Sequence, residues 1–181
     1  MLTKNNGFTL VELMVALVIS SFVVIGITGS YTTIHSTIQT SKELENAQEV
    51  IRYSSQVFTR SLKQTWEMPT FINGNEMHVK QKANTRSCIG TTPAVDYKEI
   101  FIFVQPNLSC RIEDTAGAVI SANTTLLTGI SNIDTQTNGN LFSITVLPTV
   151  LPSNFGVGAG AGVRIDIALN TLILQAAMPT P

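Results

Sequence analysis

One acidic side chain, Glu12, stands inside an apolar run that has no other charge. The run extends from Phe8 to Thr28 and reads FTLVELMVALVISSFVVIGIT. As a helix it would be about 31 Å long, close to the roughly 30 Å hydrocarbon core of a bilayer. An ionisable group at that depth costs on the order of a few kcal/mol and by default marks function. We therefore expect Glu12 to make a specific contact with a cationic partner.

The basic side chains offer Glu12 no partner within the run, because none occurs between Lys4 and Lys42. Cleavage of the chain after Gly7 would create an α-amino group at Phe8, four residues before Glu12 and on the same helix face. That amine would neutralise Glu12 within one subunit or in a neighbour packed alongside. A plain transmembrane anchor is the alternative. A secretory signal peptide is disfavoured, because its apolar stretch is only about 7–15 residues long and ends in a small-residue cleavage site.

The composition of the 181 residues argues against electrostatic partners. Only 13% of the residues are charged, against roughly 25% in an ordinary soluble domain, and the net charge is −1. The basic residues are scattered, so we predict no specific nucleic-acid partner.

Motifs that carry catalysis or metal binding are missing from the sequence. No nucleophile elbow or zinc-protease helix occurs, and the acids are dispersed without a calcium-loop pattern. The glycine-rich segment 156–162 lacks the Lys-Ser/Thr of a phosphate loop. His35 and His78 are isolated from each other and from the cysteines. We predict no catalytic residue, no cofactor and no metal, and hence a protein that is not an enzyme.

A second helical pattern follows the apolar run and predicts one helix from Phe8 to about Gln64. The spacing of its apolar residues is that of an amphipathic helix with one buried stripe. Glu49 and Arg52 are placed to form a weak surface pair, and Gly26 and Gly29 are the expected points of bending. The stripe comprises Ile34, Ile38, Leu44, Ala47, Ile51, Phe58 and Leu62.

From Phe71 onward, short β-like runs alternate with Gly, Asn, Pro and Asp. Asn138-Gly139 is a strong hairpin-turn signal. The predicted fold class is α+β, with the long N-terminal helix packed on one antiparallel β-sheet domain. The expected strands are Glu76–Lys80, Glu99–Val104, Ser109–Glu113, Leu141–Leu147 and a final hairpin of Arg164–Leu169 against Thr171–Ala176, turning near Asn170.

The stretch KNNGFTLVELMVALVIS resembles the prepilin signature of type IV pilins and of type II secretion pseudopilins. The resemblance implies that prepilin peptidase cuts after Gly7 and N-methylates Phe8, and that Glu12 is the acid used in subunit assembly. It also implies a single-pass protein of the inner membrane with a periplasmic C-terminal domain, which later becomes part of an extracellular pilus.

Shorter motifs resemble the group of the minor pilin PilW and the pseudopilin GspJ. They are IRYSSQVFTRSLKQ, LLTGISNID (Leu126–Asp134) and VRIDIAL (Val163–Leu169). This resemblance implies a minor pilin that primes or caps assembly in a tip complex, with other minor pilins, the major pilin and the inner-membrane assembly platform as partners. A type II secretion pseudopilin and a membrane-tethered adhesin or binding protein are the alternatives.

Two cysteines, Cys88 and Cys110, would close a loop of about 23 residues. In an oxidising periplasm their disulfide would stabilise the fold by roughly 3 kcal/mol; two buried free thiols are the alternative. Major pilins usually carry their cysteines near the C-terminus, whereas 71 residues follow Cys110 here. The expected organisation is a leader at 1–7, a membrane or filament-core helix at 8–30, an amphipathic helix at 31–66 and a β-rich domain at 67–181.

Overall fold

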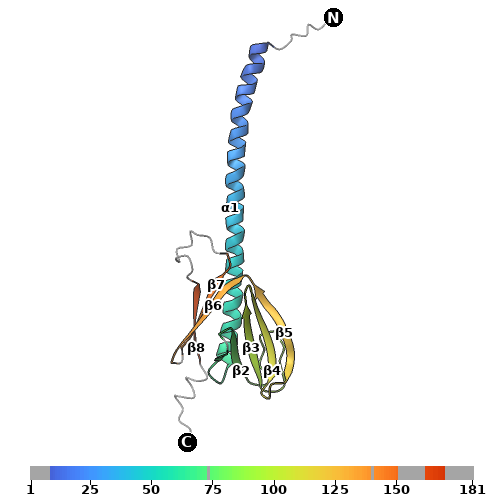
Figure 1. Ribbon diagram of the computed structural model, residues 1–181, viewed down its shortest axis with the longest axis vertical. Helices are drawn as coiled ribbons and strands as arrows, with labels where there is room; N and C mark the ends of the chain where they lie inside the picture. Colours follow the sequence, from blue (N-terminus) through green and yellow to red (C-terminus); the bar gives the residue numbers. More distant parts are fainter. Residues whose placement is uncertain (1–8, 73, 140, 151–161, 170–181) are drawn as a thin grey trace. The chain divides into compact units, whose positions relative to one another are not determined.

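The computed structural model describes residues 9–72, 74–139, 141–150 and 162–169, and the chain divides into two compact units, Met1–Lys42 and Glu43–Pro181. One helix, α1 (Leu10–Gln64), belongs to both units (Figure 1). Its C-terminal end lies at the predicted residue, and Phe8, where the helix was expected to start, lies outside the described residues. Gly26 and Gly29 fall inside the helix; a bend at either stays a prediction.

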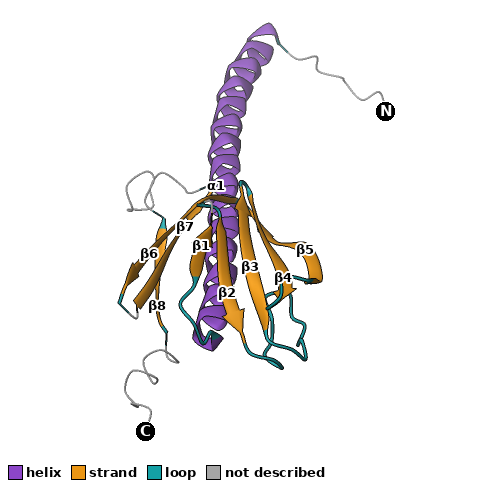
Figure 2. Ribbon diagram, turned by 60° about the horizontal axis from the view of Figure 1, so that its bottom comes forward, coloured by secondary structure: helices purple, strands orange, loops and turns teal. Residues whose placement is uncertain are grey.

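In the described part of the chain, eight strands follow α1, all paired antiparallel and divided between two sheets (Figure 2). The larger sheet has the order β1-β2-β3-β4-β5 and the smaller sheet the order β6-β7-β8. This arrangement confirms the α+β class, with two sheets in place of the single sheet expected. The strands are β1 (Thr70–Ile72), β2 (Glu76–Gln81), β3 (Tyr97–Val104), β4 (Asn107–Asp114), β5 (Val119–Thr128), β6 (Ile130–Asn138), β7 (Leu141–Pro148) and β8 (Val163–Ala168).

Within the second unit, one face of α1 is buried against both sheets (Figure 2). The buried side chains recur three or four residues apart, which is the period of a helix face. They are Ala47, Val50, Ser54, Val57, Phe58, Ser61 and Leu62. Phe58 packs its ring 5.4 Å from that of Phe101 on β3, and the core continues into the smaller sheet through Ile144 and Ile167.

The predicted apolar stripe of α1 is correct only in its C-terminal part. Ile34 and Ile38 are exposed and Ile51 is half-buried, whereas Val50 and Val57 reach the core. Two neighbouring stripes of apolar residues run along this helix. The predicted stripe lies at the edge of the buried face. The buried one is centred a residue earlier and includes the small side chains of Ala47 and Ser54.

The surface pair predicted between Glu49 and Arg52 is not among the ion pairs that the described residues form. Both side chains are exposed on α1. In water, the entropy of holding two long side chains together offsets most of the attraction between them.

The connection between β5 and β6 takes the chain from one sheet to the other at Gly129. This residue has φ = 101°, and a Cβ there would lie 3.4 Å from Cγ2 of Val50. The carbonyl of Pro106 accepts the N–H groups of Gly129 and Ile130 at 2.9 and 3.1 Å. A glycine is needed because an L side chain rarely adopts this φ and would press on the helix.

The strand predictions agree with the structure for β2, β3, β4, β7 and β8 to within one to three residues at most ends. Asn138 and Leu141 pair across the β6–β7 hairpin, as the Asn-Gly signal indicated. Strands β1, β5 and β6 were not predicted. The turn near Asn170, its second arm Thr171–Ala176 and most of the glycine-rich segment 156–162 lie outside the described residues.

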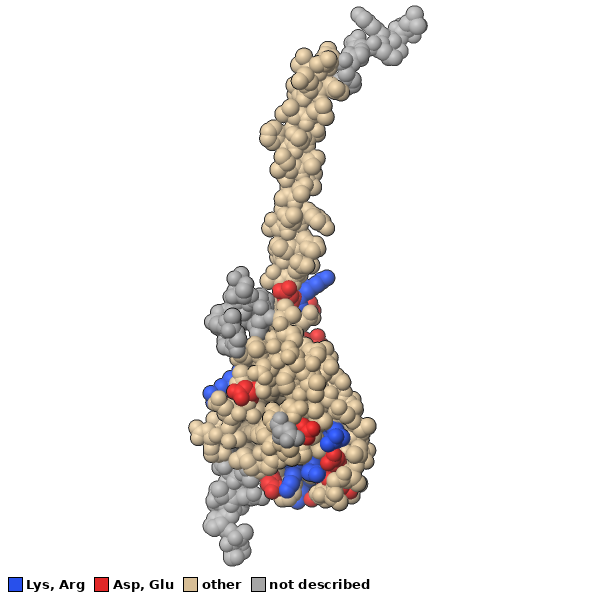
Figure 3. Space-filling view, viewed as in Figure 1, with Lys and Arg blue, Asp and Glu red and all other residues tan. Residues whose placement is uncertain are grey.

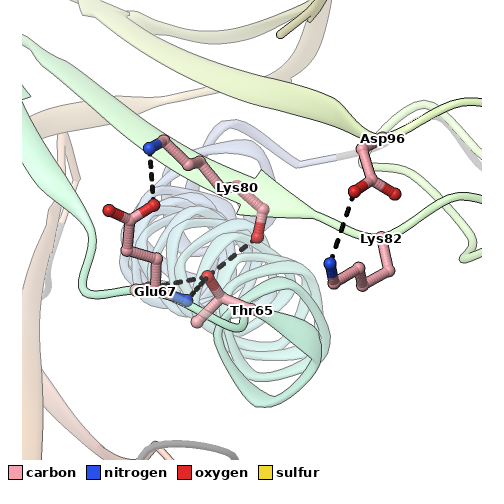
Figure 4. Close-up of polar contacts among 5 residues, drawn as sticks. All are labelled: Thr65, Glu67, Lys80, Lys82 and Asp96. Atoms are coloured by element: carbon pink, nitrogen blue, oxygen red, sulfur yellow. Dashed lines mark hydrogen bonds and ion pairs between the residues drawn. The ribbon is translucent and has the colours of Figure 1, made fainter.

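Side chains from several elements fix the C-terminal end of α1 to β2 (Figure 4). The hydroxyl of Thr65 is 2.8 Å from the carbonyl of Glu67 and 2.9 Å from that of Lys80. Lys80 forms an ion pair with Glu67, and Lys82 forms one with Asp96 at 3.4 Å. The ammonium of Lys82 also lies 4.3 Å from the ring centre of Trp66, within the range of a cation–π contact.

Candidate functional site

The N-terminal end of α1 carries a reciprocal cap built from Thr9 and Glu12. The hydroxyl oxygen of Thr9 accepts the N–H of Glu12 at 3.3 Å, and the carboxylate of Glu12 accepts the N–H and the hydroxyl of Thr9, each at 3.4 Å. Helices commonly begin with this Thr-x-x-Glu arrangement, because it satisfies two backbone N–H groups that lack a partner in the helix. Sequence reasoning missed this role of Glu12, although the Thr-x-x-Glu spacing was the signal that could have revealed it.

The apolar side chains that follow Glu12 are exposed around the whole circumference of α1. Leu10, Met14, Phe22 and Ile25 are each at least 60% exposed. An 18-residue window of α1 has a mean hydropathy of 2.6 with no residue buried inside the chain, so this helix is long and apolar enough to cross a membrane. On the face drawn in Figure 3, its N-terminal part shows no charged side chain. These properties are consistent with membrane anchoring.

The hydroxyl groups along the same part of the helix are satisfied within it. Every serine and threonine from Ser20 to Thr40 donates its hydroxyl to a carbonyl three or four residues earlier. Ser30, for example, donates to Gly26 at 3.0 Å. An unpaired polar group in hydrocarbon costs several kcal/mol, so these bonds suit the helix to a lipid or helix-packed environment.

The predicted site residues fall in separate parts of the molecule. Gly7 and Phe8 lie outside the described residues, so the contact expected between the Phe8 amine and Glu12 stays a prediction. Glu12 belongs to the first unit, and Cys88 and Cys110 belong to the second. The two cysteines form a disulfide that joins the β2–β3 loop to β4, with 6.5 Å between their Cα atoms.

A buried carboxyl group, Glu99 on β3, lies beside this disulfide and is 1% exposed. One of its oxygens accepts the N–H of Cys88 at 2.6 Å, and the other accepts the hydroxyl of Ser61 from α1. Gln81 on β2 donates to Glu99 at 3.4 Å and to the carbonyl of Ser61 at 2.8 Å. Glu99 therefore links the helix, two strands and the disulfide loop.

Burial raises the pKa of the Glu99 carboxyl, and its hydrogen bonds from Ser61 and Cys88 and the charge of Arg60 oppose that rise only in part. The group is enclosed and holds the fold together, so it is poorly placed to meet a substrate. Sequence reasoning missed this role of Glu99, because the strand pattern alone does not indicate that this carboxyl faces the core. Among the residues that the structure describes, no three or more His, Cys, Asp or Glu side chains gather where they could hold a metal ion.

Comparison with known proteins bears on the N-terminal segment. Residues 2–28 match the family described as the prokaryotic N-terminal methylation motif, a type IV prepilin-like signature. No curated protein and no solved structure matches the chain.

The motif and the geometry of α1 agree on a coarse function. The match supports a type IV pilin-like or pseudopilin-like protein and points to a structural protein rather than an enzyme. It also implies pilus-assembly partners in general. It spans the cap at Thr9 and Glu12 and most of the exposed apolar part of the helix.

Proposed function

We propose that this chain is a minor type IV pilin, a structural subunit that primes or caps pilus assembly within a tip complex. The observation that carries the proposal is Glu12, one acid at the start of an exposed apolar helix, inside a segment that matches the methylation motif. Prepilin peptidase would cut between Gly7 and Phe8 and methylate the new N-terminus. The helix would remain in the inner membrane until the subunit entered a filament.

Glu12 would act as the contact that sets subunit register. Its present partners are Thr9 atoms at 3.4 Å, which are weak and neutral donors. In lipid, a charged amine at Phe8 would be a far stronger partner, because no water competes for either charge. We propose that the carboxylate moves from the cap to such an amine, on its own or a neighbouring subunit, once the leader 1–7 is removed.

The second unit supports the choice of a minor subunit. Its disulfide lies in the middle of the fold, between the β2–β3 loop and β4, rather than around a C-terminal loop as is usual in major pilins. The motifs that resemble the PilW and GspJ group fall at the end of α1, at the β5–β6 crossing through Gly129, and on β8. We propose that this domain (67–181) lies in the periplasm and later outside the cell. It follows the apolar part (8–30) and the amphipathic part (31–66) of the helix.

A type II secretion pseudopilin is the second candidate, because the same motif and the same GspJ-like segments favour it equally. The genes that neighbour this one would separate the two: pilus genes favour the first and secretion genes the second. An adhesin or binding protein that uses the prepilin pathway only for export would not enter filaments at all.

The direct test is mass spectrometry of the protein purified from cells with an active prepilin peptidase. We expect an N-terminus at N-methylated Phe8. The variant Gly7→Val should stay uncut, whereas the matched control Gly26→Ala, which has open space for its Cβ, should be processed normally. Retention of Met1–Gly7 in the wild-type chain would refute the proposal.

The priming role has its own test. Deletion of the gene should strongly reduce the number of pili, and the intact gene should restore it. A normal number of pili in the deletion strain, once redundant minor pilins are also removed, would contradict a priming role.

A further inference from the structure

A hollow of about 430 Å³ opens on the surface of the second unit, between α1, the β2–β3 loop and β5. Among the described residues that line it there are two arginines and no aspartate or glutamate. Its polar wall comprises Tyr53, Gln56, Arg60, Arg86, Thr124 and Thr125. A concave site lined by guanidinium, amide and hydroxyl groups has the chemistry to receive an anion.

Arg60 is held in place but incompletely satisfied. Its Nη2 donates to the carbonyls of Ser87 and Cys88 at 3.0 and 3.5 Å, which fixes the guanidinium against the loop. Its Nε–H is buried and has no hydrogen-bond partner among the residues that the structure describes. A buried donor without an acceptor carries a desolvation penalty, so an acceptor brought by a ligand would remove an existing penalty.

Arg86 adds a second positive charge at the mouth of the hollow. Its side chain is exposed, and neither arginine takes part in the ion pairs of the described residues. The loop that carries Arg86 is held by the disulfide and by the bond from the Cys88 N–H to Glu99. Both arginines therefore extend from backbone that is held in place, which lowers the entropy cost of binding.

The charges of α1 show which partner would bring the anion. Within the second unit, the acids Glu43, Glu45 and Glu49 come first, and the bases Arg52, Arg60 and Lys63 follow. None of the six takes part in the ion pairs of the described residues. Glu49 and Arg60 are 11 residues apart, about 16 Å along a helix. A parallel helix of the same kind, shifted by that distance, would place its acids opposite these bases.

We propose that this hollow binds a carboxylate side chain from an acidic helical segment of a neighbouring pilin-like subunit. Arg60 and Arg86 form charge-assisted hydrogen bonds to the carboxylate, and Gln56 contacts its helix from the side. The identity of the partner rests on the proposed function, whereas the anion site itself rests on Arg60, Arg86 and the absence of acids among the lining residues described.

The test uses the full-length chain in cells that assemble filaments, with a photo-crosslinking amino acid in place of Gln56. We expect a crosslink to a Glu- or Asp-containing helical peptide of a protein that carries the N-terminal methylation motif. Arg86→Glu should lower the crosslink yield by about tenfold, the equivalent of one charge-assisted contact. Arg86 makes no hydrogen bond or ion pair that the fold needs, so this variant should fold normally.

Two further variants serve as comparisons. Lys42→Glu changes the net charge by the same amount outside the hollow and should leave the yield unchanged. Arg60→Lys keeps the charge but loses the Nε–H and the planar fork, and it should lower the yield about as much as Arg86→Glu.

Three results would overturn the inference: a yield insensitive to Arg86→Glu, a crosslink to phospholipid, or a crosslink to a protein without the motif. They are separable from failure of the proposed function. A methylated Phe8 together with an Arg86-insensitive crosslink would reject this site alone, whereas retention of Met1–Gly7 would reject the pilin assignment.

Discussion

At the scale of single residues, the two acids Glu12 and Glu99 have opposite surroundings. Glu12 is exposed at the start of α1, where its carboxylate accepts the Thr9 N–H. Glu99 is enclosed among Ser61, Gln81 and Cys88, and burial favours its neutral form. Glu12 is therefore available to a partner from outside, whereas Glu99 serves the fold.

Substitutions at Glu12 can separate its charge from its role as a cap. Glu12→Gln keeps an oxygen acceptor for the Thr9 N–H but loses the charge, and Glu12→Ala loses both. If the charge meets an amine in the filament, both variants should enter sheared filaments about tenfold less than wild type, since one buried ionic contact is lost. The measurement is the ratio of filament-bound to membrane-bound protein by immunoblot.

Thr9→Val provides the control, because it removes only the hydroxyl from the cap. Loss of a cap costs about 1 kcal/mol in an isolated helix, and a membrane or a bundle would hold this helix regardless, so incorporation should stay near the wild-type level. Normal incorporation of Glu12→Gln would show that Glu12 acts as a cap and would contradict the ionic contact.

The raised pKa of Glu99 makes the stability of the second unit depend on pH. The unfolded chain releases this proton near the ordinary glutamate value of 4.5, and the folded chain releases it only at a higher pH. Above pH 4.5 the folded state therefore binds more protons, and the free energy of unfolding falls as pH rises. The slope from one such group is at most about 1.4 kcal/mol per pH unit.

Glu99→Gln removes that titration while keeping an oxygen for the Cys88 N–H. Denaturant unfolding between pH 4.5 and 7 should show a flatter pH dependence for this variant than for wild type. Equal slopes for the two proteins would mean that Glu99 does not titrate in this range.

At the scale of elements, the crossing between the sheets at Gly129 is the connection with least tolerance for change. Gly129→Ala would place a methyl group 3.4 Å from Val50 in a backbone region with φ = 101°. We expect a loss of about 1–3 kcal/mol in the free energy of unfolding. Gly26→Ala, with open space at its Cβ, should not destabilise the chain; thermal unfolding of both variants in detergent measures the difference.

The disulfide also joins elements of the fold, because it links the β2–β3 loop to β4. The double variant Cys88→Ser, Cys110→Ser removes a bridge across a sequence separation of 22 residues. It should lower the free energy of unfolding by roughly 3 kcal/mol, and a reducing agent should do the same to the wild-type chain but not to the variant. Equal stability of the reduced and oxidised wild-type chains would indicate that the bridge contributes nothing.

The elements differ in how far the sequence alone predicts them. The end of α1 at Gln64 and the strands β2, β3, β4, β7 and β8 follow local patterns of period 3.6 or 2, which sequence carries directly. The predicted start of the helix at Phe8 lies outside the described residues. Strand β5 was missed because most of its residues are exposed and its register with β4 is broken by bulges, so no alternation survives. Strand β6 was missed because it is a polar edge strand. The division into two sheets was missed because it depends on the contact of Gly129 with the Pro106 carbonyl, two positions that lie 23 residues apart.

The candidate site was predictable only where it is local. Glu12 could be predicted because a charge in an apolar helix is costly unless it has a specific partner. The Arg60 and Arg86 hollow brings together a helix, a loop and β5, and no pattern along the chain indicates that these three elements meet. The same holds for Glu99, whose burial results from the packing of three elements.

At the scale of the whole molecule, the two units differ in what stabilises them. In the described residues, every buried side chain belongs to the second unit, between Ala47 and Leu169. The described residues of the first unit bury none, so packing among the described residues does not stabilise this part of α1. The second unit should therefore fold without the first.

A chain that starts at Glu43 tests this division. It keeps all the buried side chains of α1, and Glu43 and Glu45 would fall in its first helical turn, where acids stabilise a helix. We expect a protein that is soluble without detergent and whose unfolding midpoint lies within about 3 °C of that of the full chain in detergent, since about 1 kcal/mol corresponds to 2–4 °C at this size. A chain that starts at Ser55 would lose Ala47, Val50 and Ser54 from the core and should be several kcal/mol less stable. If the Glu43 chain were as unstable as the Ser55 chain, the apolar helix would be part of the folding unit, and membrane insertion would have to precede folding of the domain.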